Sequence, residues 1–292
     1  MFPEKEIEES FRYCEKLAKE HYENFPVGSM LVPKEKRKYV HSIYAFARTA
    51  DDIADSCSLD EKRKLEGLNL LEHELDMVYE GKADEVSADN LRFLRSLYRT
   101  KEDLNIPEAE FKDLLTAFKQ DSVKNRYGTF DELLRYSSFS ANPIGHLVLY
   151  VFGYDRERDE KLFGYSDKIC TALQLTNFWQ DVSRDLEIDR VYIPAEVMEK
   201  HGYSYEQLFA KVENKAFREM IKELTDRTRR IFEEGRELIH GLSGRLKYEI
   251  KATYAGGNMI LDKIEGIDYG VLSERVKLGK TDKAKILFRT AF

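Results

Sequence analysis

The sequence has no long hydrophobic run and few cysteines. Its longest apolar stretch, around HLVLYVFG, is far too short to cross a bilayer, and the N-terminal MFPEKEIEES lacks the apolar core of a secretion signal. Its three cysteines, Cys14, Cys57 and Cys170, are far apart and have neither the spacing of metal ligands nor the even number of a disulfide framework. We therefore expect a reduced, cytoplasmic protein that is soluble or at most peripheral to a membrane.

Proline and glycine are also scarce, at 6 and 16 of 292 residues. No linker, low-complexity tract or internal repeat divides the chain. With 42% hydrophobic and 35% charged residues, the chain has enough apolar material for a core and too much for a disordered protein. We expect a single globular domain over residues 1–292 that ends in a basic C-terminal tail from about residue 270.

An excess of positive charge is absent as well. The chain has 47 basic and 54 acidic residues, well interspersed, and a net charge of −7, so no nucleic-acid surface is predicted. The local exception is the stretch RVKLGKTDKAKILFRTAF, where Asp282 is the one acid. Its basic residues are Arg275, Lys277, Lys280, Lys283, Lys285 and Arg289. Two interpretations stay open: a solvated tail, or a surface that contacts an anionic membrane.

Alternating, strand-like runs are almost absent, and helical periodicity dominates. Apolar residues recur at helical spacing over residues 7–22, 34–56, 60–80, 156–186, 213–242 and 244–264. Pro107 and two capping-box pairs, Thr129 with Glu132 and Ser204 with Gln207, mark further helix starts. The predicted fold class is all-α, with about ten or more helices packed around a common interior.

Three aspartates crowd the stretch YAFARTADDIADS directly after an apolar run. On a helix, Asp51 and Asp55 lie on one face and form a carboxylate pair, whereas Asp52 points elsewhere. Like charges at this spacing cost only a few tenths of a kcal/mol when solvated, so an exposed acidic face is one interpretation.

A second pair with the same spacing favours another interpretation. Asp181 and Asp185 also follow an apolar and aromatic run, in LQLTNFWQDVSRD. Two such pairs on separate helices suggest carboxylates that face each other across a cavity. Carboxylate oxygens without interleaved His or Cys suit Mg²⁺, which is usually held by one or two carboxylates plus substrate phosphates. The pattern therefore predicts an apolar cavity with a rim that binds a diphosphate through Mg²⁺.

The two acidic segments FARTADDIAD and LQLTNFWQDVSRD, with DRVYIP after the second, resemble the signatures of the squalene and phytoene synthase family. The resemblance runs from HYENFPVGSMLVPKEKR to KATYAGGNMILDKI and so covers most of the chain. It implies an isoprenoid-synthase-like helical bundle with a central apolar cavity, and head-to-head chemistry on prenyl diphosphates.

The resemblance also implies a role for each matching position. Asp51, Asp55, Asp181 and Asp185 would bind the two or three Mg²⁺ ions that hold the diphosphate. Arg48 and Arg190 would contact the diphosphate, Gln174 and Asn177 would line the same rim, and Phe25, Tyr44, Tyr136 and Tyr254 would surround the reaction cavity. Plainer readings stay open: the arginines as surface residues paired with nearby acids, and Tyr136 and Tyr254 as ordinary core residues.

Departures from the usual family pattern indicate one particular branch of the family. The chain has SANPIG where many relatives carry a cysteine-containing stretch, Gln180 where many carry an arginine, and Glu23 and Asn24 where many carry hydroxyl residues. With HYENFPV, YAFARTADDIAD and LTNFWQDVSRD, these features resemble the bacterial hydroxysqualene synthases of the hopanoid pathway. That branch ionises presqualene diphosphate and lets water quench the cation.

The hypothesis is therefore a Mg²⁺-dependent carbon–oxygen lyase that converts presqualene diphosphate and water to hydroxysqualene. No NADPH is expected. Contact with enzymes upstream and downstream in the pathway is a further expectation. One alternative is a prenyltransferase that condenses two farnesyl diphosphates to presqualene diphosphate, squalene or dehydrosqualene. A remote alternative is a non-catalytic assembly protein of the same fold.

Overall fold

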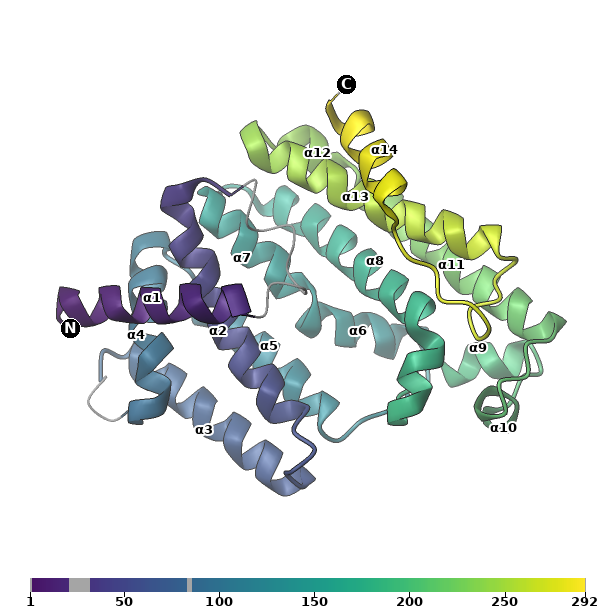
Figure 1. Ribbon diagram of the computed structural model, residues 1–292, viewed down its shortest axis with the longest axis horizontal. Helices are drawn as coiled ribbons and strands as arrows, with labels where there is room; N and C mark the ends of the chain where they lie inside the picture. The colour runs from purple at the N-terminus through teal and green to yellow at the C-terminus, as the bar shows by residue number, and fades with distance from the viewer. Residues whose placement is uncertain (1, 21–31, 83–85, 292) are drawn as a thin grey trace. The chain divides into compact units, whose positions relative to one another are not determined.

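The computed structural model describes residues 2–20, 32–82 and 86–291, and within that part helices joined by turns and loops make up the fold (Figure 1). The one strand-like feature described is an isolated bridge between Arg126 and Val191. The all-α prediction is confirmed. Internal contacts divide the chain into two compact units, residues 1–124 with 143–160 and residues 125–142 with 161–292. Neither unit is one continuous stretch, in keeping with the missing linker.

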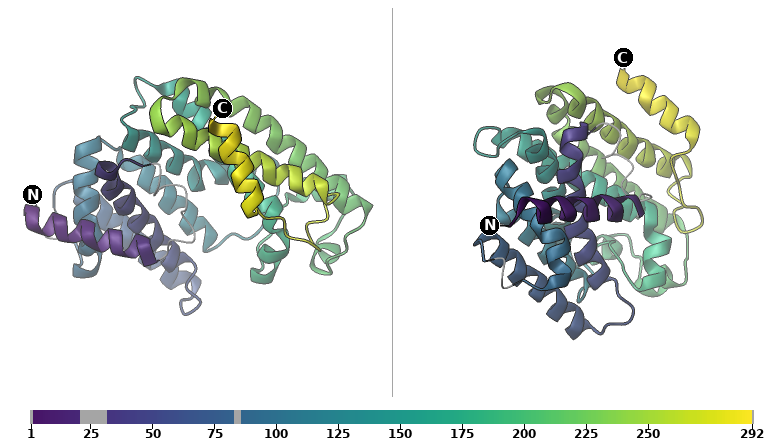
Figure 2. Two further views of the ribbon diagram at one scale, coloured as in Figure 1. Left: turned by 45° about the horizontal axis from the view of Figure 1, so that its top comes forward. Right: turned by 60° about the vertical axis from the view of Figure 1, so that its left-hand side comes forward.

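The first unit is built around helix α2. Its elements are α1 (Glu4–Glu20), η2 (Lys34–Lys36), α2 (Arg37–Ala54), α3 (Glu61–Tyr79), α4 (Ala88–Leu104), α5 (Glu108–Asp121) and α7 (Asn142–Phe152). Helix α2 packs against α1, α3, α4 and α5, and α1 lies across α2 and α4 (Figure 2). The apolar stripe of α2, including Ala45, Phe46 and Ala50, is fully buried. This burial fixes which face of α2 is left for polar residues.

The second unit is built around the long helix α8. Its elements are α6 (Phe130–Ser140), α8 (Glu160–Asp185), η4 (Leu186–Ile188), α9 (Ala195–Lys200), α10 (Tyr205–Phe209), α11 (Lys215–Gly235), α12 (Glu237–Gly241), α13 (Gly244–Gly266) and α14 (Lys280–Ala291). Trp179 of α8 is fully buried, and its indole N–H donates to Thr228 Oγ1 of α11 at 2.8 Å. A Cβ on Gly257 of α13 would lie 2.5 Å from the Phe232 ring, so glycine permits the close approach there.

The helix starts test the capping predictions. Ser204 and Gln207 form the full capping box of α10. Thr129 caps α6 by accepting from the Glu132 N–H, but the Glu132 carboxylate accepts from the Gly128 N–H in place of the expected Thr129 N–H. The segment predicted as one helix over 213–242 is interrupted at Arg236, between α11 and α12.

The basic C-terminal stretch is ordered as well. Residues 280–291, expected as part of a tail, form helix α14, which packs on α13 (Figure 1). Among the described helices, none combines the length and the apolar character needed to cross a membrane.

Candidate functional site

The predicted carboxylates of the first unit lie at the C-terminal end of α2. Asp51 is in the last turn, and Asp55 is the C-cap residue, whose N–H donates to Asp51 O at 2.8 Å. Arg48, one turn earlier, donates to Asp51 Oδ2 at 3.3 Å and also forms an ion pair with Asp52. Asp52, expected to point elsewhere, therefore shares one guanidinium with Asp51. Arg48, on the same helix, therefore neutralises part of the negative charge of this acidic turn.

An apolar pocket lies directly beside these polar residues. It is lined by Val40, Ile43, Tyr44 and Ala47 of α2 and by Ile144, Leu147, Val148 and Val151 of α7. Tyr44 stands one turn before Arg48, and burial raises the pKa of its phenol. The first unit thus brings an apolar pocket and a cation–carboxylate cluster to successive turns of one helix.

The carboxylates of the second unit lie in the last two turns of α8. Burial raises the pKa of Asp185 to about 7, and the negative charge of Asp181, one turn earlier, adds to the rise. The positive charges of three arginines oppose it: Arg190, Arg184 and Arg275. A half-buried carboxylate whose charged form is disfavoured would gain from a nearby cation.

Arg275 is the residue that the sequence analysis missed. It was assigned to the basic tail, but its guanidinium forms a bidentate pair with Asp181, with Nη2 at 3.0 Å from Oδ2. The neighbouring Gln180 donates through Nε2 to Val276 O at 2.7 Å. Two adjacent side chains of α8 thus hold two adjacent residues of the segment before α14. The pair spans 94 positions, so no local signal could have revealed it.

Arg190 and Tyr136 meet an aromatic cluster in the second unit. The Arg190 N–H donates to Asp185 O at 2.8 Å, and Arg190 and Asp185 line one small pocket with Phe178 and Tyr192. The rings of Phe178 and Tyr192 stack with centroids 3.8 Å apart, and Tyr136 lies 6.1 Å from each. Tyr136 is 4% exposed and therefore belongs to the core as well as to the surroundings of Asp185.

The remaining predicted positions are placed as follows. On α8, Gln174 is half-buried and Asn177 is exposed, one or two turns before Asp181. On α13, Tyr254 donates through its hydroxyl to Glu233 Oε1 at 2.7 Å, and its ring meets Phe232 edge-on. Burial raises the pKa of Tyr254 to about 12. Phe25 lies outside the described residues. That the two carboxylate pairs face each other across a cavity stays a prediction.

The donor chemistry of both helices fits Mg²⁺. In the described ranges, no three or more His, Cys, Asp or Glu side chains gather into a complete metal site. Mg²⁺ does not require one, because it keeps several waters and takes substrate phosphates beside one or two carboxylates. Asp51 with Asp55, and Asp181 with Asp185, offer oxygen ligands of this kind on each helix.

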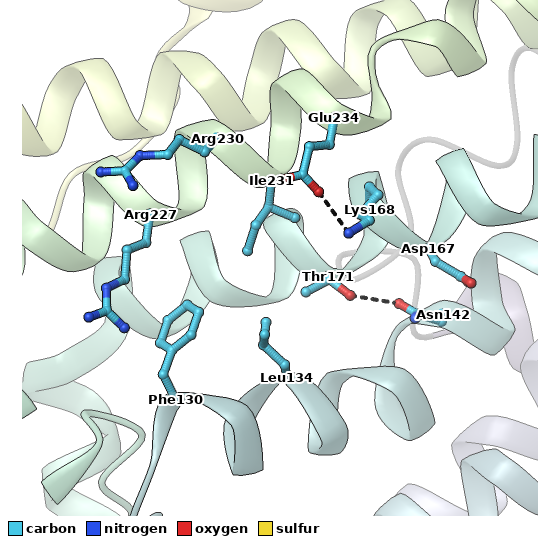
Figure 3. Close-up of a pocket in the computed structure, with 10 residues that line it drawn as sticks. All are labelled: Phe130, Leu134, Asn142, Asp167, Lys168, Thr171, Arg227, Arg230, Ile231 and Glu234. Carbon is cyan, nitrogen blue, oxygen red and sulfur yellow. Dashed lines mark hydrogen bonds and ion pairs between the residues drawn. The ribbon is translucent and has the colours of Figure 1, made fainter. Parts of the chain in front are cut away.

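A wider hollow of about 430 Å³ lies elsewhere in the second unit, between α6, α8 and α11 (Figure 3). It contains none of the predicted site residues. Two of the three cations that line it are paired, Lys168 with Glu234 at 2.7 Å and Arg227 with Glu223 at 2.6 Å, and the third, Arg230, is exposed. Thr171 donates to Asn142 Oδ1 at 3.0 Å at its edge (Figure 3). Because none of the predicted site residues lines this hollow, we do not assign it as the reactive site in spite of its size.

Comparison with known proteins agrees with the residue pattern. The chain is 34% identical to a hydroxysqualene synthase of Rhodopseudomonas palustris over 258 residues, which cover 88% of this chain and 83% of that protein. It is 27% identical to a chloroplastic phytoene synthase 1 of Zea mays over 285 residues, 96% of this chain and 68% of that protein. The crystal structure of squalene synthase HpnC from Alicyclobacillus acidocaldarius matches with a TM-score of 0.83 and 34% identity, covering 92% of this chain and 97% of that one.

Residues 18–282 match the family described as squalene/phytoene synthase, so the match includes both carboxylate pairs and Arg275. It is therefore to the squalene/phytoene synthase family, whose enzymes act on prenyl diphosphates, that this chain belongs.

Proposed function

We propose that the protein converts presqualene diphosphate and water to hydroxysqualene and diphosphate, with two or three Mg²⁺ ions and without NADPH. The observation that carries this proposal is the repeated arrangement of two carboxylates one turn apart with an arginine beside them: Arg48 with Asp51 on α2, and Arg275 with Asp181 on α8. The similarity to a hydroxysqualene synthase over most of both chains supports the choice of branch.

The first unit supports a role in binding both ends of such a substrate. An apolar chain in the pocket beside Tyr44 would have its diphosphate end near Arg48 and Asp51. Negative charge builds on the diphosphate as its C–O bond breaks, and a guanidinium there stabilises the transition state more than the ground state. Mg²⁺, when bound, supplies further positive charge to the departing group.

The second unit also combines positive charge beside its carboxylates with aromatic side chains. Arg190 and Arg275 bring positive charge to Asp185 and Asp181. Aromatic faces such as those of Tyr136 and Tyr254 in this unit attract a carbocation by about 0.5–2 kcal/mol each without reacting with it, and Tyr44 offers such a face in the first unit. Walls of this kind keep bulk water away until one molecule attacks the cation and loses a proton to give the alcohol.

Product analysis tests the proposal. Purified protein incubated with presqualene diphosphate and Mg²⁺, without NADPH, should give a C30 alcohol by mass spectrometry. Formation of squalene, and only when NADPH is added, would refute it. Asp51→Asn with Asp55→Asn should abolish release of diphosphate, while the matched control Asp89→Asn, at an acid of α4 whose side chain is 88% exposed, should not.

The second candidate is condensation of two farnesyl diphosphates, favoured by the similarity to a phytoene synthase over 96% of the chain. Labelled farnesyl diphosphate supplied alone separates the two reactions, because only the condensing enzyme turns it into a C30 product. A non-catalytic assembly role would leave function in cells unchanged in the Asp51→Asn, Asp55→Asn double variant. Retention of all four carboxylates argues against that role.

The proposal extends to location. A cytoplasmic enzyme with peripheral membrane contact, next to the enzymes that make its substrate and use its product, suits an apolar C30 substrate and product. Cys14, which is buried and hydrogen-bonded to Ser96 as a free thiol, suits a reducing compartment.

A further inference from the structure

Helix α14 carries a pair of neighbouring apolar side chains that are left in solvent. Leu287 is 65% exposed and Phe288 is 69% exposed. Among the described residues, the other large hydrophobic side chains exposed to a similar degree, such as Leu70 and Ile188, stand singly. Scattered exposed hydrophobic residues are normal, but an adjacent pair on one helix needs an explanation.

The opposite face of α14 is the one that packs. Ile286 is 7% exposed and Thr290 is 6% exposed, and Ile286 reaches the surroundings of Gly256 on α13. Lys251 of α13 donates through Nζ to Thr290 O at 3.3 Å. The helix is therefore fastened to its unit by the face with Ile286 and Thr290, whereas Leu287 and Phe288 are mostly exposed to solvent.

Lysines border the exposed apolar pair. Lys280, Lys283 and Lys285 are all exposed. Leu287 follows Lys283 by four residues and Phe288 follows Lys285 by three, so each apolar side chain has a lysine one turn before it. A lysine in this position can lay its methylene groups along an apolar surface while its ammonium group reaches outward.

The one acid of α14, Asp282, does not pair with the exposed lysines of this helix. Asp282 is 13% exposed at its side chain, where it pairs with Lys263 of α13 at 2.9 Å and accepts from the Gly279 N–H at 2.8 Å. It therefore caps α14 and ties it to α13 instead of neutralising the exposed lysines. In a chain with a net charge of −7, this outer face of α14 is basic.

We propose that the outer face of α14, formed by Lys280, Lys283, Lys285, Leu287 and Phe288, docks the protein on an anionic lipid membrane. Exposed apolar side chains bordered by lysines are the pattern of helices that lie in the plane of a bilayer interface. Leu287 and Phe288 enter the layer between headgroups and acyl chains, while the lysines contact the anionic headgroups. A helix of 12 residues is about 18 Å long, which suits lying on the surface and not crossing it.

Vesicle binding by the full chain tests this proposal without any substrate. The protein should sediment with vesicles that contain roughly one third phosphatidylglycerol in phosphatidylcholine, and much less with pure phosphatidylcholine. Because each lysine near an anionic surface contributes about fivefold to binding, Lys283→Gln with Lys285→Gln should weaken binding by about 25-fold. Added salt should weaken it as well.

Matched controls separate the surface from general effects. Leu287→Ser with Phe288→Ser should abolish binding, whereas Leu70→Ser with Val123→Ser, at two singly exposed positions, should leave it intact. Lys62→Gln with Lys215→Gln, whose side chains are 86% and 89% exposed, should also leave it intact. Circular dichroism should show the wild-type helix content in every variant, since the packed face of α14 is kept.

Any one of three vesicle results would overturn the proposal: no binding to anionic vesicles, equal binding to neutral ones, or equal binding by the α14 variants and their controls. Self-association that depends on Leu287 and Phe288, without lipid binding, would assign the face to a second copy of the chain and also overturn it. None of these outcomes bears on the proposed chemistry, which is measured with presqualene diphosphate in detergent micelles.

Discussion

Glu249 on α13 is an acid in an apolar place, and its replacement should change how stability depends on pH. The residue is 7% exposed, and in the described part of the chain its Oε2 has no hydrogen-bond partner. Burial raises the pKa of Glu249 from its ordinary value of 4.5 to about 7. Between these two values the folded protein keeps a proton that the unfolded chain has released. Stability therefore falls as the pH rises from about 4.5 to about 7 and then levels off.

The size of the effect follows from the two pKa values. Each unit of pKa corresponds to about 1.4 kcal/mol, so ionised Glu249 costs about 3 kcal/mol of unfolding free energy at pH 8 and less than about 1 kcal/mol at pH 5. A buried glutamine has no such titration. Glu249→Gln should therefore gain about 2–3 kcal/mol relative to the wild type between pH 5 and pH 8.

Urea unfolding followed by circular dichroism at several pH values between 5 and 8 measures this difference. Asp185, whose pKa burial also raises to about 7, titrates equally in both proteins and cancels in the comparison. Glu9→Gln, at an exposed acid of α1, serves as the control and should follow the wild type at every pH. A gap between Glu249→Gln and the wild type that stays constant from pH 5 to pH 8 would refute the reasoning.

Two further substitutions test packing and charge. Arg275→Gln removes a positive charge from Asp181, so calorimetry should show Mg²⁺ binding to the substrate-free protein about tenfold more tightly; weaker binding would contradict this account of the pair. Gly257→Ala would place a Cβ 2.5 Å from the Phe232 ring and should cost about 1–3 kcal/mol in urea unfolding. Gly164→Ala, on α8 with no side chain within 4 Å of the added Cβ, should be neutral or stabilising by up to about 1 kcal/mol.

The helical class was predictable because it depends on local patterns. Ser204 and Gln207 are three residues apart, and the hydrogen bonds of their capping box need nothing from the rest of the chain. The capping box predicted for α6 is only half right, because a neighbouring N–H group competes for the carboxylate of Glu132. This carboxylate accepts from the Gly128 N–H and not from the Thr129 N–H. The break at Arg236 directly follows Gly235, a residue that favours a helix end, and the prediction from periodicity alone ran through it.

The candidate site also contains residues that local spacing could predict and a contact that it could not. The carboxylate pairs, at i and i+4, could be read from spacing, and Arg48 from its place one turn before Asp51. Its second partner, Asp52, was set aside because helical geometry points it away from Asp51, yet a long arginine side chain reaches both. The contact of Arg275 with Asp181 depends on how the chain returns to α8 after α13, which no pattern in either segment encodes.

Trp179 gives the molecule a built-in optical reporter. It is the one tryptophan in the chain, it is fully buried, and it adjoins Gln180 and Asp181. Its fluorescence therefore reports on the second unit alone, whereas the far-ultraviolet circular dichroism sums the helices of both units. If the two units unfold as one cooperative body, both signals change at the same urea concentration. A fluorescence change completed at lower urea than the loss of circular dichroism would show that the half of the protein that carries Asp181 can open while the half that carries Asp51 stays folded.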